Sequence, residues 1–196
     1  VFLSVMVLVS IFVFFLMPYL ISFIAPGFDL MSQSKVIEIS RIMLLSPILM
    51  GLSNLFGTIT QLFRKFFIYD LSPIFYNFGI IIGIVFLYPI FSVYGLAYGV
   101  VLGAFLHFLI QAISSMQSGF SLKLSSSINF QEIKKTVMIS LPRTLGLSMN
   151  SLALISIIAL ASFLKAGSIS IFNFSFNLQS VPLNIIGISY AVAAFP

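Results

Sequence analysis

Residues 1–24 read VFLSVMVLVSIFVFFLMPYLISFI and contain no charged side chain. A helix needs about 20 apolar residues to cross the roughly 30 Å hydrocarbon core of a bilayer, so this stretch is long enough to span it. The motif Ala25-Pro26-Gly27-Phe28 then ends the predicted helix. The run is too long and too rich in phenylalanine for the core of a secretory signal, and no small-residue cleavage site follows it. The stretch therefore predicts an integral membrane protein.

The composition of the chain indicates the same class. Apolar residues make up 60% of the 196 positions and charged residues 7%, against about 45–50% and about 25% in soluble domains. Nine basic and four acidic side chains are too few to cover a soluble fold of this size. This excludes a soluble enzyme, a nucleic-acid-binding module and a disordered tail, and the net charge of +5 is that of basic membrane loops.

Five more apolar segments follow the first. We expect them at about residues 36–62, 71–91, 93–116, 131–163 and from 168 onward. The sequence lacks the ten-residue alternation of a membrane barrel. The predicted fold class is therefore an all-α integral membrane protein with six transmembrane helices.

The basic residues predict an orientation. One side of the membrane would carry Arg64, Lys65, Lys123, Lys134 and Lys135, and the other would carry Lys35, Lys165 and Arg41 just inside a helix. The side with more Lys and Arg is expected to be cytoplasmic. The Val1 end is then cytoplasmic, and the turn at residues 25–33 faces outward.

The longest polar segment, residues 117–136, predicts the domain organisation. It is expected to be a cytoplasmic connector that ends in a short interfacial helix, and a plain loop is the alternative. It separates four expected helices in residues 1–116 from two in residues 137–196. We therefore expect the boundary between two lobes here.

The sequence lacks the residues of most catalytic sites. It has one histidine, no cysteine, no metal-ligand spacing and no phosphate-binding glycine motif. We expect no enzymatic activity, no cofactor and no metal. His107, four residues before Gln111, is expected to hydrogen-bond a neighbouring helix, with proton coupling as the alternative.

Small residues predict where helices pack or bend. Gly95, Gly99 and Gly103 stand four positions apart and allow a second helix to approach closely. Bending during a conformational cycle is the alternative interpretation. Pro182 is expected to break the last helix, either as the bend of a transporter or as a static kink.

Polar residues inside the last two helices are the candidates for a binding site. Arg143 lies near the cytoplasmic end of its helix, where its side chain either reaches the surface or holds an anionic headgroup in an aqueous cavity, because the planar guanidinium suits phosphate. Asn173 and Asn177 share a helix face. The predicted cavity wall, taken as a set, is Arg143, Asn150, Asn173, Asn177 and Gln179. Amides that only bond neighbouring helices are the alternative.

Several motifs, in this order along nearly the whole chain, are similar to those of one family. They are Ala25-Pro-Gly-Phe28, residues 57–66 with Arg64-Lys65-Phe66, Pro73 with Asn77, residues 95–111, Gly119, residues 161–170, Pro182, Gly187 and Pro196. The chain resembles the lipid II flippase family (MurJ, also called MviN), within the superfamily of multidrug, oligosaccharidyl-lipid and polysaccharide exporters. Two departures stand out. Gln61 replaces a usual asparagine, and Phe176-Asn177 stands where the family often has Asp-Arg facing its anionic substrate.

The resemblance implies a larger protein and a function. The chain would be a fragment covering helices three to eight of fourteen, in a two-lobed exporter-type bundle around a central cavity. Alternating access of that cavity would move lipid II, an undecaprenyl-pyrophosphate-linked disaccharide-peptide, to the outer leaflet of a bacterial inner membrane. The expected partners are lipid II or a related polyprenyl-pyrophosphate glycolipid, membrane lipids and cell-wall synthesis proteins, without nucleic acid.

Three rival functions remain open at this point. A polysaccharide-lipid or multidrug exporter of the same superfamily is the nearest, because Asn177 cannot neutralise a pyrophosphate. Either Arg143 and helices outside this chain compensate, or the substrate differs. A structural membrane protein without a transport cycle is the second rival. An ion channel is the third, although the sequence shows no filter motif.

Overall fold

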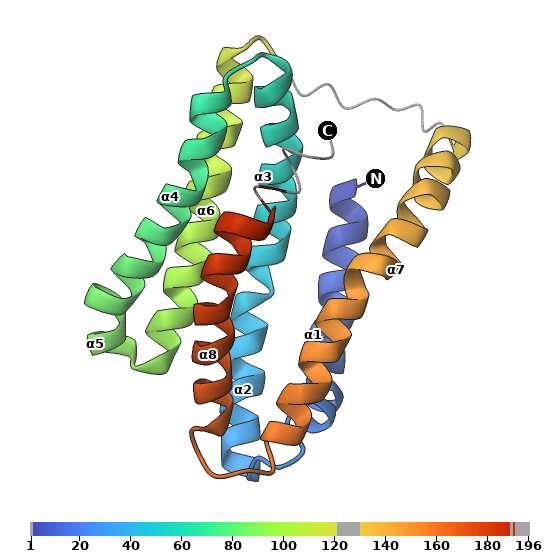
Figure 1. Cartoon of the computed structure of the whole chain (residues 1–196). Helices are drawn as coiled ribbons and strands as arrows, with labels where there is room; N and C mark the ends of the chain where they lie inside the picture. Colours follow the sequence, from blue (N-terminus) through green and yellow to red (C-terminus); the bar gives the residue numbers. More distant parts are fainter. Residues whose placement is uncertain (1, 121–129, 189, 191–196) are drawn as a thin grey trace. The chain divides into compact units, whose positions relative to one another are not determined.

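The computed structural model describes residues 2–120, 130–188 and 190, and these residues form helices joined by short turns (Figure 1). The expected all-α class is confirmed. Five helices of the described part are long and apolar enough to cross a membrane. They are Phe2–Ile24, Leu30–Leu62, Phe66–Phe91, Val93–Gln117 and Ile133–Ala161.

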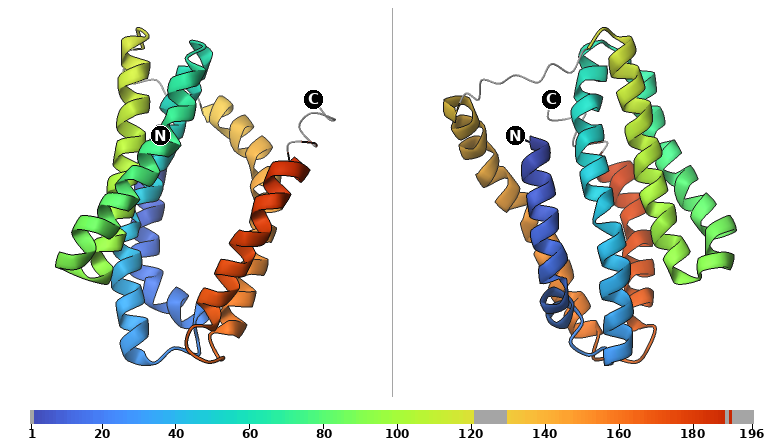
Figure 2. Two further views of the ribbon diagram at one scale, coloured as in Figure 1. Left: turned by 60° about the vertical axis from the view of Figure 1, so that its left-hand side comes forward. Right: turned by 180° about the vertical axis from the view of Figure 1, so that it is seen from behind.

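Contacts divide the chain into two compact units. The first comprises Val1–Leu20 and Met31–Asn129, and the second Ile21–Leu30 and Phe130–Pro196. The helices of the first unit are α1 (Phe2–Ile24, except its last residues), α2 (Leu30–Met43), α3 (Leu45–Leu62), α4 (Phe66–Ile82), η1 (Gly83–Leu87), α5 (Tyr88–Phe91) and α6 (Val93–Gln117). Helices α3, α4 and α6 pack side by side (Figures 1 and 2).

The second unit is a helical hairpin with a loop packed on its turn. Helices α7 (Phe130–Ala161) and α8 (Ser168–Pro182) meet at a turn and separate away from it, and η2 (Leu183–Ile188) continues α8 (Figures 1 and 2). Gly167 takes the left-handed conformation in this turn, with φ of 95°, which glycine adopts without a steric penalty. The backbone N–H of Gly27 donates to the hydroxyl of Ser162 at 3.0 Å. The motif Ala25-Pro26-Gly27-Phe28 therefore hydrogen-bonds to the turn between α7 and α8.

Two spans begin earlier than expected, and each contains a proline. The second span begins at Leu30 and is interrupted at Leu44, three residues before Pro47, which has no N–H to donate to the carbonyl of Met43. The third span begins at Phe66, so Pro73 lies in the helix interior and not in its first turn. In these two spans proline lies near a break or inside a helix, whereas Pro89 lies in the first turn of the short helix α5.

The predicted connector is partly outside the described residues, as is Lys123. Its described residues are 117–120, which end α6 and form the turn after it, and 130–136, which are the first turns of α7. The helix expected at the end of the connector is continuous with α7, and the connector itself stays a prediction. The last expected segment corresponds to α8 and η2, and its amides and serines set it apart from the five more apolar spans.

Glycines allow backbone-to-backbone packing in the first unit. A Cβ atom placed on Gly83 would lie 2.5 Å from the Cα of Gly99, and one on Gly99 equally close to Gly83. Gly79 and Gly103 meet in the same way, and Gly95 lies against the backbone of Leu87. The small residues of α6 thus lie directly against α4 and η1, the close approach that small residues permit in membranes.

Candidate functional site

The five residues predicted as a cavity wall all belong to the second unit. Arg143 and Asn150 lie on α7, and Asn173, Asn177 and Gln179 lie on α8. All five are exposed. Among the described residues, none of these side chains has a hydrogen-bond or ion-pair partner. In the described part of the chain, no hydrogen bond between α7 and α8 occupies these five side chains.

Helix geometry divides these residues into faces. Arg143 and Asn150 are seven positions apart, close to two turns, so they share one face of α7. Asn173 and Asn177 share one face of α8. Gln179 comes six positions after Asn173 and points about 120° away from it around the helix. The structure thus groups two pairs and leaves Gln179 apart, and their joint role as a cavity wall stays a prediction.

Gln111 is the most enclosed polar side chain of the first unit. It is fully buried on α6, and its amide Nε2 donates to the Ser72 hydroxyl at 2.6 Å and to the carbonyl oxygen of Tyr69 at 3.3 Å. That carbonyl lies four residues before Pro73, which has no N–H for it. A side chain from a neighbouring helix therefore satisfies a backbone group that proline frees, as a bilayer interior requires.

Arg41 also donates to a carbonyl that a proline leaves without its helical N–H donor. Its Nε donates to the carbonyl oxygen of Phe14 at 3.3 Å, and Phe14 lies four residues before Pro18 within α1. The guanidinium carbon also lies 4.6 Å from the centre of the Phe14 ring, within the range of a cation–π interaction. From the sequence, Arg41 enters only the charge count that predicts the orientation, as a residue just inside a helix. The sequence signal for its contact is Pro18 inside an apolar run, which leaves the Phe14 carbonyl in need of a donor.

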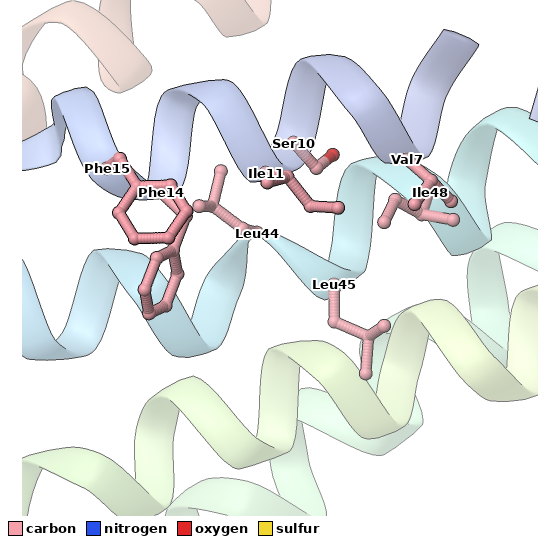
Figure 3. Close-up of a pocket in the computed structure, with 8 residues that line it drawn as sticks. All are labelled: Val7, Ser10, Ile11, Phe14, Phe15, Leu44, Leu45 and Ile48. Carbon is pink, nitrogen blue, oxygen red and sulfur yellow. The ribbon is translucent and has the colours of Figure 1, made fainter. Parts of the chain in front are cut away.

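An apolar groove lies beside Arg41. It has a volume of about 370 Å³ and lies at the break between α2 and α3. Figure 3 shows its five lining residues from α1 opposite Leu44 and Ile48. The lining residues are Val7, Ser10, Ile11, Phe14, Phe15, Leu44, Leu45 and Ile48. A second hollow of about 430 Å³, also bordered by Leu44, includes Ser46, Tyr76 and Val100.

Glu38 lies one helical turn before Arg41 but has a different partner. The hydroxyl of Tyr94, at the start of α6, donates to Oε2 of Glu38 at 2.5 Å. Among the described residues Arg41 forms no ion pair. The two charged residues of α2 therefore contact different helices of the first unit, and neither neutralises the other directly.

His107 joins α6 to α3. Its Nδ1 lies 2.6 Å from the hydroxyl of Ser53, and that hydroxyl also donates to the His107 carbonyl at 3.1 Å. Both side chains are buried. The expected interhelical hydrogen bond of His107 is confirmed. Among the described residues no group of three His, Cys, Asp or Glu side chains could hold a metal ion.

Comparison with known proteins gives the family. A family model described as "Lipid II flippase MurJ" matches residues 1–196, the entire chain. The chain belongs to the lipid II flippase MurJ family. The resemblance drawn from its motifs is thereby confirmed, and so is the prediction of an integral membrane protein.

Individual relatives of this family cover most of the chain. "Probable lipid II flippase MurJ" of Borreliella burgdorferi is 35% identical over 76% of this chain. The protein of the same name from Haemophilus influenzae is 30% identical over 71%, and "Lipid II flippase MurJ" of Burkholderia cenocepacia is 25% identical over 82%. The aligned part spans only 29%, 28% and 32% of these three MurJ proteins.

Proposed function

We propose that the full-length protein is a lipid II flippase. It would move this undecaprenyl-pyrophosphate-linked disaccharide-peptide from the inner to the outer leaflet of the bacterial cytoplasmic membrane. The observation that carries this proposal is the match of the MurJ family model to residues 1–196. The relatives named as lipid II flippases support it.

The polar residues of the second unit supply the chemistry for an anionic headgroup. Arg143 offers a planar fork of N–H donors that fits a pyrophosphate, and Asn150 shares its helix face. Asn173 and Asn177 offer amides from α8. Because all are exposed and have no partner among the described residues, they are available to a substrate. The proposed cavity wall is therefore this set, with Gln179 on a separate face.

Each of the two units has backbone features that are typical of helices that bend. Glycine contacts between α6 and η1 leave no side chain between the backbones. The π-helix η1 precedes Pro89, and η2 follows Pro182, and such local π-turns often lie at functional positions. These features support alternating access, in which no substrate bond is made or broken. The protein is then a transporter and not an enzyme, and it needs no cofactor.

The membrane placement follows from the basic residues. We propose the bacterial inner membrane with the Val1 end in the cytoplasm, since Arg64, Lys65, Lys134 and Lys135 would lie on that side. Membrane lipids surround the helices, and cell-wall synthesis proteins are the proposed protein partners. A fusion reporter inserted at Gly119 tests the orientation, and its detection outside the cell would reverse it.

The decisive experiment reconstitutes the full-length protein in liposomes with fluorescent lipid II in the inner leaflet. Time-dependent appearance of lipid II on the other leaflet supports the proposal. One observation favours a second function: Phe176-Asn177 occupies the position of the Asp-Arg pair that the family often carries. A polysaccharide-linked polyprenyl phosphate therefore serves as the competing substrate. Its transport without that of lipid II would make the protein a polysaccharide-lipid exporter.

A further inference from the structure

We propose that Arg41 and the adjacent groove form a binding site for the polyprenyl pyrophosphate part of the substrate within the N-terminal helices. Arg41 would hold the anionic head, and the groove between residues 7–15 and residues 44–48 would hold a segment of the isoprenoid tail. This inference rests on the proposed flippase function and adds a site outside the α7–α8 set.

The depth of the Arg41 contact is the first argument. Arg41 donates to the carbonyl oxygen of Phe14, which lies ten positions before Ile24, the end of the uncharged helix α1, or about 15 Å along it. That distance is half of the roughly 30 Å hydrocarbon core. A cation at this depth is costly and is by default a functional residue that faces a partner or an aqueous cavity.

The unused donors of Arg41 are the second argument. Its Nε is committed to the carbonyl of Phe14, and the ring of Phe14 lies against one side of the guanidinium. Glu38, the acidic residue one turn away, accepts its hydrogen bond from Tyr94. Among the residues that the structure describes, the two terminal amino groups of Arg41 have no partner, so they offer four N–H donors, the fork that matches a phosphate.

The third argument is that the apolar groove begins beside the cation. Phe14 both lines the groove and contacts Arg41. From Val7 to Phe15 the groove follows about 12 Å of α1. Its lining is aliphatic and aromatic, with Ser10 as the one hydroxyl. A cation at one end of an apolar groove is complementary to an amphiphile with an anionic head and a hydrocarbon tail.

A purely structural role for Arg41 must be separated from a binding role. Arg41→Gln does this, because Nε2 of glutamine lies the same number of bonds from Cα as Nε of arginine. Gln111 already makes this contact at the carbonyl of Tyr69. The Gln variant thus keeps a donor for Phe14 but removes the charge. Arg41→Lys keeps the charge and removes the fork.

The test uses the full-length protein in nanodiscs and radiolabelled undecaprenyl pyrophosphate as the probe. A photoreactive benzoylphenylalanine replaces Ile11, which lines the groove, or Val9, which is exposed on the opposite face of α1. We expect cross-linking of the probe at position 11 and not at position 9. We also expect Arg41→Gln to weaken probe binding about tenfold, Arg41→Lys to weaken it less, and both variants to unfold at the wild-type temperature.

Three outcomes would overturn this site. They are equal cross-linking at positions 9 and 11, wild-type binding by Arg41→Gln, and displacement of the probe by an equal amount of phosphatidylglycerol, which would make the groove a phospholipid site. Lipid II transport by the same wild-type preparation separates the two proposals. Transport with an unaffected Arg41→Gln variant removes only this site, whereas probe binding at Arg41 without lipid II transport removes only the proposed function.

Discussion

The buried amide of Gln111 donates to the carbonyl oxygen of Tyr69, 42 positions earlier in the chain. This carbonyl needs an outside donor because Pro73 has no N–H. Arg41 and Phe14 form the same relationship across 27 positions, with Pro18 as the proline. In both cases a proline inside a membrane helix specifies a contact with a neighbouring helix. Both prolines lie inside continuous helices, so their effect is a tertiary hydrogen bond to the freed carbonyl and not a break in the helix.

Removal of the Gln111 amide should destabilise the first unit. In Gln111→Leu the Tyr69 carbonyl and the Ser72 hydroxyl both lose the donor, and we expect a loss of about 1–2 kcal/mol. Thermal unfolding of the full-length protein in detergent measures it. Gln117→Leu is the matched control, because Gln117 lies on the same helix but is exposed. Equal unfolding temperatures for the two variants would contradict the assigned contact.

Restoring the missing backbone N–H at position 73 should reduce the contribution of Gln111 to the free energy of unfolding. Pro73→Ala supplies a helical donor for the Tyr69 carbonyl, so the cost of Gln111→Leu should shrink by about 0.5–1 kcal/mol in the Pro73→Ala background. A double-mutant cycle of unfolding free energies measures this coupling. If the two substitutions are simply additive, the proline and the amide do not act on the same carbonyl.

A methyl group between α6 and η1 should separate the helices. Gly83→Ala places a Cβ against the backbone of Gly99, which cannot move aside cheaply, so we expect a loss of about 1–3 kcal/mol. Gly146→Ala is the control, because its Cβ would meet nothing within 4 Å. There alanine should be neutral or stabilising by up to about 1 kcal/mol. The prediction fails if both variants unfold at the same temperature.

Glycine should stabilise the turn between α5 and α6. Ser92 has φ of 54° and ψ of −138°, a conformation that is strained for a residue with a Cβ. We expect Ser92→Gly to raise the free energy of unfolding by about 1 kcal/mol. Ser118→Gly is the comparison, since Ser118 has an ordinary φ of −84° and should lose stability instead. A destabilised Ser92→Gly protein would show that the turn is not strained.

The paired faces of α7 and α8 should matter for transport. We expect the double variant Arg143→Ala, Asn177→Ala to reduce lipid II transport by about tenfold or more, because it removes charged and amide donors to a pyrophosphate. Gln179→Ala should have a smaller effect, since Gln179 points away from Asn173 and Asn177. Normal transport, or normal growth when the double variant replaces the native flippase, would remove these residues from the site.

The membrane class and the spans could be predicted because they depend on local composition. Hydrocarbon accepts long uncharged runs whatever their neighbours are, and the ordered motifs from Ala25 to Pro182 sufficed for the family. The second and third spans begin at Leu30 and Phe66, before the expected residues 36 and 71. Pro73 therefore lies inside a helix, which a membrane helix tolerates when a neighbouring side chain donates to the carbonyl that the proline leaves free.

The sequence by itself therefore determined that the chain is helical, lies in a membrane and belongs to its family. Only the tertiary structure decided which side chains work together: Arg41 with Phe14, Gln111 with Tyr69, and Glu38 with Tyr94. The physical reason is that hydrophobicity is a property of each segment, whereas a hydrogen bond depends on which atoms of distant segments come within about 3 Å. No periodicity along the chain encodes that distance.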